Sequence, residues 1–162
     1  VHKKDRVCVE DDHIQIDSTP VFVERLDGRQ MGCYVCKGKE KRCFSVMYSC
    51  YNDWRRLLSY AALKIDPETI WENPEKYKDK PFFELICMSD CEGAIGPVTS
   101  KKLASDFKDF SRSVKKIIPE LIKEHGFYPW DDEVGIEEWL RMYSSLRKGF
   151  TFASDNGFVK FG

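Results

Sequence analysis

The sequence lacks any apolar run of the roughly 20 residues that a membrane-spanning helix requires. Its first stretch, VHKKDRVCVEDD, also lacks the apolar core of a signal peptide. Neither sign of charge is in excess, because 26 Lys and Arg face 27 Asp and Glu, for a net charge of −1. No overall field therefore draws the chain to nucleic acid or to a membrane. The missing apolar runs, together with the odd number of cysteines, predict a cytoplasmic protein.

The seven cysteines do not suit a closed disulfide framework, because their number is odd. Free thiols in a reducing compartment are the simpler interpretation. Cys33 and Cys36, followed by Cys43 and Cys50, resemble a zinc quartet. Six residues separate the second pair, however, and residues three apart in a strand point to opposite faces. We therefore expect no metal site and no cofactor.

The length of 162 residues suits a single domain, 1–162, with its own core. Short β-prone runs separated by turn signals predict that residues 1–49 are mainly β. Residues 50–148 are predicted to be mainly helical, and 149–162 to form a hairpin around Asn156 and Gly157. The predicted fold class is α+β: an N-terminal antiparallel β meander packed against about three to four helices, with a short C-terminal β hairpin.

Two of the predicted helices have clear patterns. Pro97 suits the first position of a helix, where its missing N–H costs nothing. Apolar residues then recur at spacings of three and four: Leu103, Phe107, Phe110, Val114, Ile117 and Leu121. A last helix is predicted over 131–148, because its first turn is acidic and its last turn is basic.

The stretch LICMSDCEGAIGPVTSKKL raises the main functional question, which is what Cys91 does between two carboxylates. A tight turn accounts for most residues of this loop, because Ser and Asp side chains can accept hydrogen bonds from nearby backbone N–H groups and Gly93 can adopt a positive φ. The helix start that follows is a natural anion site. The ligand-binding candidates are Ser89, Asp90, Cys91, Glu92, Gly93, Lys101, Lys102, Arg55 and Arg56.

Catalytic alternatives for the same loop remain open. A nucleophilic Cys91 needs a lowered pKa and a base, but Asp90 and Glu92 adjoin the thiol. The three histidines of the chain lie in polar, turn-like or terminal sequence. The two carboxylates could instead perform acid–base chemistry or bind a divalent cation, although the loop is far from an EF-hand pattern. We predict no catalytic residue.

A basic stripe runs along the helix that begins at Pro97. Lys101, Lys108, Arg112 and Lys115 follow one another at intervals of seven, four and three residues. Such a stripe is most often a solvated helix face. The alternative is a pocket for a phosphate-bearing ligand.

From about Phe44 to Phe152 the chain resembles an uncharacterised family of small bacterial and phage proteins. That family has an apolar run, then His-Ser-Asp-Cys-Asp-Gly, then a Ser-Pro or Thr-Pro helix start. The matching residues here are Ser89 to Gly93 and the Gly96-Pro97 start, with Met88 in place of the family's His. The resemblance implies no particular activity, and the missing His weakens any His-dependent chemistry.

The sequence therefore predicts a small cytoplasmic, non-catalytic binding protein. Its expected partner is another protein or an anionic, nucleotide-like ligand, with no membrane and no strong nucleic-acid signal. A phage- or host-defence-related role as an inhibitor or sequestering protein suits its size. The alternative is an enzyme that uses the loop of Asp90, Cys91 and Glu92, with or without a divalent metal. We expect a monomer or a small homo-oligomer.

Overall fold

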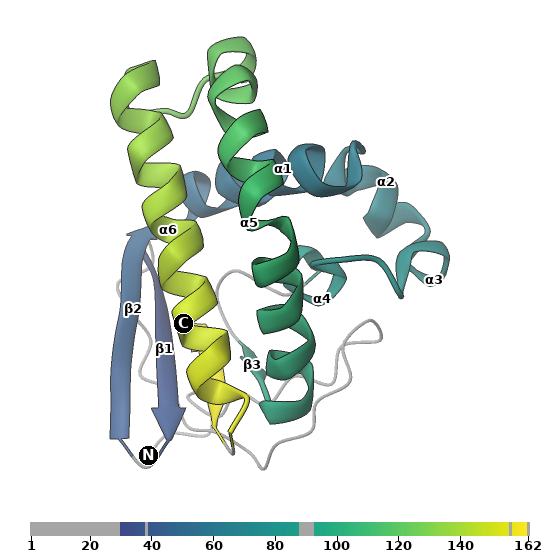
Figure 1. Cartoon of the computed structure of the whole chain (residues 1–162), viewed down its shortest axis with the longest axis vertical. Helices are drawn as coiled ribbons and strands as arrows, with labels where there is room; N and C mark the ends of the chain where they lie inside the picture. Colours follow the sequence, from purple (N-terminus) through teal and green to yellow (C-terminus); the bar gives the residue numbers. More distant parts are fainter. Residues whose placement is uncertain (1–29, 38, 88–92, 156, 162) are drawn as a thin grey trace.

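Helices make up most of the described part of the chain. The computed structural model describes residues 30–37, 39–87, 93–155 and 157–161, and for the first two strands it describes the backbone alone. The helices are α1 (Tyr48–Leu63), α2 (Pro67–Glu72), α3 (Pro74–Tyr77), α4 (Phe83–Cys87), α5 (Pro97–His125) and α6 (Asp132–Ala153). Figure 1 shows α5 and α6 as two long neighbouring helices, with α1 crossing behind them.

Four short strands pair beside α6. They are β1 (Gln30–Lys37), β2 (Lys39–Met47), β3 (Gly93–Ile95) and β4 (Phe158–Phe161). The strand order is β2-β1-β4-β3, and each neighbouring pair is antiparallel. The C-terminal strand β4 therefore joins the hairpin of β1 and β2 to the short segment that precedes α5.

The predicted α+β fold class is wrong. The described structure is dominated by helices, and it has six of them where three to four were expected. A meander would place consecutive strands side by side, but the second neighbour of β1 is β4 from the other end of the chain. Residues 1–29, where the first predicted strands fall, lie outside the described residues.

The predicted C-terminal hairpin is also wrong, because residues 149–153 continue α6. Phe150 is fully buried there, and its ring stacks at 5.8 Å between centroids on Phe107 of α5. Burial against a neighbouring helix therefore outweighs the alternating pattern of GFTFA, which by itself favours a strand. Beyond the turn, β4 pairs with β1 and β3 instead of folding back on 149–153.

The predicted helix from Pro97 is confirmed as α5. Pro97 is its first residue, and Gly126 ends it with a φ of 77° and an N–H bonded to the Ile122 carbonyl. The apolar stripe faces the core, with Leu103 and Phe107 fully buried and Phe110 only partly so. In the part of the chain that the structure describes, no helix is long and apolar enough to cross a membrane.

Two tryptophans connect α1 to α6 in the core. Trp54 Nε1 donates to the Trp139 carbonyl at 3.0 Å, and Trp139 Nε1 donates to the Trp54 carbonyl at 3.2 Å. Their rings stack with centroids 5.1 Å apart. Each buried indole N–H is thus satisfied while the ring fills the core, as a buried Trp requires. This pair holds α1 across the back of the α5–α6 layer.

Candidate functional site

Most of the predicted loop site lies outside the described residues. Ser89, Asp90, Cys91 and Glu92 belong to that group, and only the backbone of Gly93 is described, paired with Phe161 in the sheet. The turn and nucleophile interpretations of Cys91 therefore both stay predictions. The other four candidates, Arg55, Arg56, Lys101 and Lys102, are all described, and they fall into very different surroundings.

Arg55 is a buried structural cation. It is only 6% exposed, and its Nη1 donates to the Leu85 carbonyl at 3.3 Å and to the Ile86 carbonyl at 3.2 Å. Its Nη2 donates to Asn52 Oδ1 at 2.5 Å, and the guanidinium lies 4.9 Å from the Tyr51 ring centroid. Arg55 thus supplies donors to two carbonyls in the last turn of α4.

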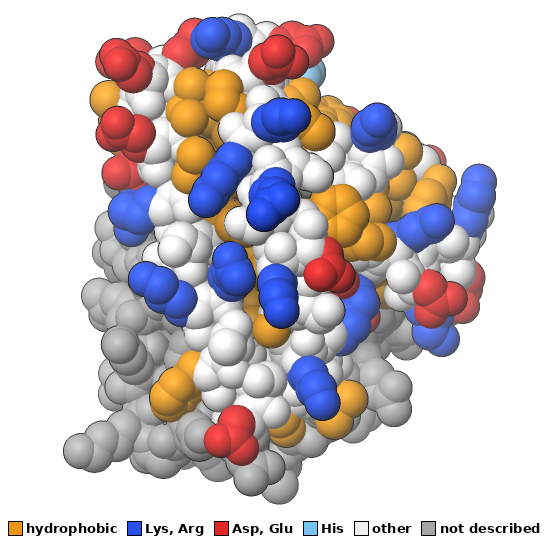
Figure 2. Space-filling model, viewed as in Figure 1, with side chains coloured by type: hydrophobic (Ala, Val, Ile, Leu, Met, Phe, Trp, Pro, Cys, Tyr) orange, Lys and Arg blue, Asp and Glu red, His pale blue; other side chains and the backbone are white. Residues whose placement is uncertain are grey.

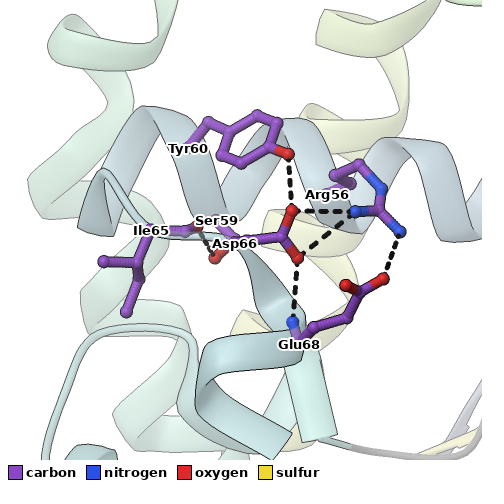
Figure 3. A network of polar contacts seen from close by, with 6 residues as sticks. All are labelled: Arg56, Ser59, Tyr60, Ile65, Asp66 and Glu68. Carbon is purple, nitrogen blue, oxygen red and sulfur yellow. Dashed lines mark hydrogen bonds and ion pairs between the residues drawn. The ribbon is translucent and has the colours of Figure 1, made fainter.

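Arg56 takes part in a polar network between α1 and the start of α2 (Figure 3). Its Nη1 lies 3.0 Å from Asp66 Oδ2, and its Nη2 lies 3.4 Å from Glu68 Oε1. Asp66 also accepts from the Glu68 N–H at 2.9 Å and from the Tyr60 hydroxyl at 2.8 Å. These bonds, that of the Glu68 N–H first, hold the pKa of Asp66 below its usual value. Arg56 therefore stabilises the cap of α2.

Lys102 connects α5 to α4 and to the segment that precedes α4. Its Nζ lies 2.7 Å from Glu84 Oε1 and 3.0 Å from Asp106 Oδ2, and it donates to the Lys80 carbonyl at 2.9 Å. Asp106 in turn accepts from the N–H of Phe82, a non-glycine residue with a φ of 62°. The side chain of Lys102 is thus used to hold an unusual backbone turn. It does not join Lys101 in an anion site at the start of α5.

Lys101 belongs instead to an exposed row of cations along α5. Lys101, Lys108, Arg112 and Lys115 are all exposed, as the predicted stripe requires. Helical geometry places them within one sector of about 60° on α5, along the edge of its buried side. Figure 2 shows Lys and Arg side chains gathered over the α5–α6 side of the molecule.

Arg147 of α6 extends this row. It lies one helical turn after Tyr143, whose buried hydroxyl donates to the Phe107 carbonyl at 2.5 Å. Burial raises the pKa of Tyr143, while the nearby charge of Arg147 acts to lower it. Arg147 therefore belongs to a turn of α6 that lies beside the middle of α5. We name Lys101, Lys108, Arg112, Lys115 and Arg147 the basic face.

The basic face differs from Lys102 and Arg56 in its charge pairing, although other exposed lysines of the described ranges, such as Lys76, Lys78 and Lys80, also make no ion pair. Within the described ranges, none of its five side chains makes an ion pair, whereas Lys102 and Arg56 make two each. The sequence analysis did not identify Arg147 as part of this row. The local pattern of a single helix does not determine which residues of a neighbouring helix lie beside it. The only local signal was its place four residues after a tyrosine on the buried side of α6.

Thiol and metal chemistry find little support in the described part of the chain. Cys50 is buried, and burial raises its pKa to about 11, so its thiol stays protonated at neutral pH. Among the described side chains, no group of three His, Cys, Asp or Glu residues could hold a metal ion. The side chains of Cys33, Cys36 and Cys43 are not among the described ones, so the expectation that they bind no zinc stays a prediction.

Comparisons of the chain with models of protein families, with curated protein sequences and with solved structures found no match. The resemblance to small bacterial and phage proteins accordingly stays a prediction.

Proposed function

We propose that this protein is a non-catalytic binding protein that holds an anionic partner on its basic face. The observation that carries the proposal is the clustering of five cations without an ion pair on neighbouring turns of α5 and α6. Lys102 and Arg56 are engaged by carboxylates of the same chain, whereas the five cations of the basic face have no such carboxylate among the described residues. A bound anionic partner would neutralise their positive charge.

The spacing within the basic face supports this proposal. Arg112 lies four residues after Lys108 and three before Lys115, so that like charges occupy neighbouring positions on one side of α5. Such pairs destabilise a helix by about 0.2 to 0.5 kcal/mol each. Asp109 is the one exposed acidic residue of α5 between Lys101 and Lys115, and it makes no ion pair with these cations. Their accumulation favours a binding role over a purely solvated face.

The proposal includes the cellular location that the sequence predicts. We propose a cytoplasmic location, on the odd number of cysteines and the absence of a long apolar run from the sequence. In this setting a small binding protein can act by covering or sequestering an anionic host component. An inhibitory or sequestering role of this kind is part of the proposal.

Retention on immobilised heparin, a general polyanion, tests the proposed function. The wild-type protein should be retained at low salt, because exposed cations attract a polyanion that salt then screens. A triple variant with Lys108→Glu, Arg112→Glu and Lys115→Glu should pass through unretained. These side chains are exposed, so its melting temperature should stay close to that of the wild type.

A matched control variant reverses the charge of three exposed lysines outside the basic face. Lys76→Glu, Lys78→Glu and Lys80→Glu change the net charge by the same amount at exposed positions in and just after α3. Figure 1 places α3 far from α6, on the other side of α5. The control should elute near the salt concentration of the wild type. Equal elution of both triple variants would mean that net charge alone governs retention, and the proposal would then be wrong.

A further inference from the structure

The composition around the basic face indicates the chemistry of the partner. Large hydrophobic side chains are exposed at five described positions: Trp71, Val98, Tyr128, Val134 and Phe152. None of them lies between Lys101 and Lys115 of α5 or in the turn of α6 that holds Arg147. The other exposed residues of α5 from 101 to 116 are Ser105, Asp109, Ser113 and Lys116, which add two hydroxyl donors, one carboxylate and a further cation.

This composition suits a phosphate backbone better than a protein surface. The central part of a protein–protein interface is enriched in aromatic residues and depleted in Lys. Interfaces with nucleic acid are more polar and much more positive, and Lys, Arg and Ser side chains make most of their phosphate contacts. The basic face has the second composition. It also offers no exposed aromatic ring, within the described residues, on which an unpaired base could stack.

We propose that the basic face binds the phosphate backbone of double-stranded nucleic acid, without reading its base sequence. This inference rests on the proposed function and names the class of its anionic partner. Lys101 and Lys115 are fourteen residues apart on a continuous helix, which corresponds to about 21 Å. At about 3.4 Å per base pair, this length matches about six base pairs of a duplex.

The small net charge of the chain does not oppose this partner, because the charges are segregated. Acidic residues crowd the other end of the α5–α6 pair, and Figure 2 shows red side chains gathered there at the top of the molecule. They include Glu120, Glu124, Asp131, Asp132, Glu133 and Glu137. A duplex would therefore be attracted to the middle of α5 and repelled from its C-terminal end. The field of this segregated surface, and not the sum of charges, decides where a polyanion binds.

The test is fluorescence anisotropy with labelled duplexes of about 20 base pairs, long enough to cover the stripe. Two DNA duplexes of unrelated sequence should bind with equal affinity within about twofold, because phosphates carry no sequence information. The logarithm of the binding constant should fall with the logarithm of salt with a slope of about −4 to −5, as five phosphate contacts predict. The Lys108, Arg112 and Lys115 triple variant should bind at least about 100-fold more weakly at low salt.

Single substitutions and further probes sharpen the result. Arg112→Gln should reduce the magnitude of the salt slope by about 1, whereas Lys102→Met should leave it unchanged, since Lys102 is engaged within the chain. A duplex RNA of equal length separates RNA from DNA as the source of the phosphates. Tight binding of either duplex supports the proposal, provided that the triple variant loses it.

Other outcomes would overturn the inference in distinguishable ways. Retention on heparin and binding to polyglutamate, without binding to either duplex, would leave the proposed function standing and identify an acidic protein as the partner class. Failure to bind heparin and both duplexes would remove the inference and the proposed function together. Duplex binding that survives in the triple variant would show that another surface holds the nucleic acid.

Discussion

Adjacent cations in this chain have opposite surroundings. Lys101 is exposed and makes no ion pair with a described residue, whereas Lys102 contacts two carboxylates and a carbonyl. Arg55 is buried against the end of α4, and its neighbour Arg56 is half-exposed above the start of α2. Successive residues of a helix differ by about 100° in direction, so one side chain of each pair can face the protein while the other faces solvent or a different neighbour.

The comparison separates cations that hold the fold from cations that can hold a partner. Arg55, Arg56 and Lys102 form the first set, which we call the structural cations, and the basic face forms the second. Substituting a structural cation should lower stability and leave anion binding unchanged in the molecules that still fold. Substituting a cation of the basic face should weaken anion binding and leave stability nearly unchanged. The following substitutions test that separation, beginning with the largest expected loss of stability.

Arg55→Leu should lower the free energy of unfolding by about 2 to 3 kcal/mol, because it removes charged donors from buried carbonyls. Leu fills part of the same volume but cannot donate to the Leu85 and Ile86 carbonyls. Urea denaturation followed by circular dichroism measures the loss. Heparin retention of the folded variant should be nearly unchanged.

Trp71→Phe is a suitable comparison for Arg55→Leu. The indole of Trp71 also donates to the Ile86 carbonyl, at 3.1 Å, but from a half-exposed position where water can replace it. Its loss should therefore cost about 1 kcal/mol or less. If Arg55→Leu were as mild as Trp71→Phe, Arg55 would not be a structural cation.

Asp66→Ala should lower the free energy of unfolding by about 1 to 2 kcal/mol, since it removes the cap of α2 together with the partner of Arg56. The effect should depend on pH in a defined direction. The folded state lowers the pKa of Asp66, so its contribution is present above the usual carboxyl value near 4. That contribution is lost as the pH falls through the lowered pKa.

Denaturation of wild type and Asp66→Ala across pH 7 to acid measures this contribution. The two curves should converge only as the pH falls below the lowered pKa of Asp66, where this carboxyl is protonated in the folded wild type as well. A difference that stayed constant into strong acid would mean that the carboxylate charge is irrelevant and that only the shape of the side chain matters.

The separation of these two sets could be predicted only in part from the sequence. The apolar stripe and the basic stripe of α5 both follow from local spacing, since a helix fixes which residues share a side. The partners of the structural cations are not local. Arg55 meets Leu85 thirty positions away, and Lys102 meets Glu84 eighteen positions away. Such contacts depend on how α4 and α5 pack, which no local pattern contains.

The failed fold-class prediction has the same origin. GFTFA alternates as a strand does, but Phe150 and Gly149 are buried as part of α6 because α5 provides a surface that fits them. Likewise, β4 finds its neighbours in β1 and β3, which lie far away in the sequence. Local propensity is a weak guide where tertiary contacts decide between helix and strand.

Lys102→Met should lower the free energy of unfolding by about 1 kcal/mol. The apolar side chain keeps its length but leaves Glu84 and Asp106 facing each other without their shared cation. Adding Glu84→Gln to Lys102→Met should recover part of the loss, because one of the two facing charges is then removed. A double-mutant cycle by chemical denaturation measures this coupling. Additive losses would indicate that Lys102 acts through its contact with the Lys80 carbonyl alone.

Arg112→Gln should have the smallest effect on stability and the opposite sign. It relieves the repulsion from Lys108 and Lys115, each worth about 0.2 to 0.5 kcal/mol, so that the free energy of unfolding should rise by about 0.5 kcal/mol at low salt. This gain should shrink as salt screens the charges. The matched variant Arg112→Lys keeps the charge and should match the wild type in stability, in heparin retention and in the salt slope for duplex binding. A loss of stability in Arg112→Gln that Arg112→Lys does not share would place Arg112 among the structural cations, and the basic face would then have to be redrawn without its central residue.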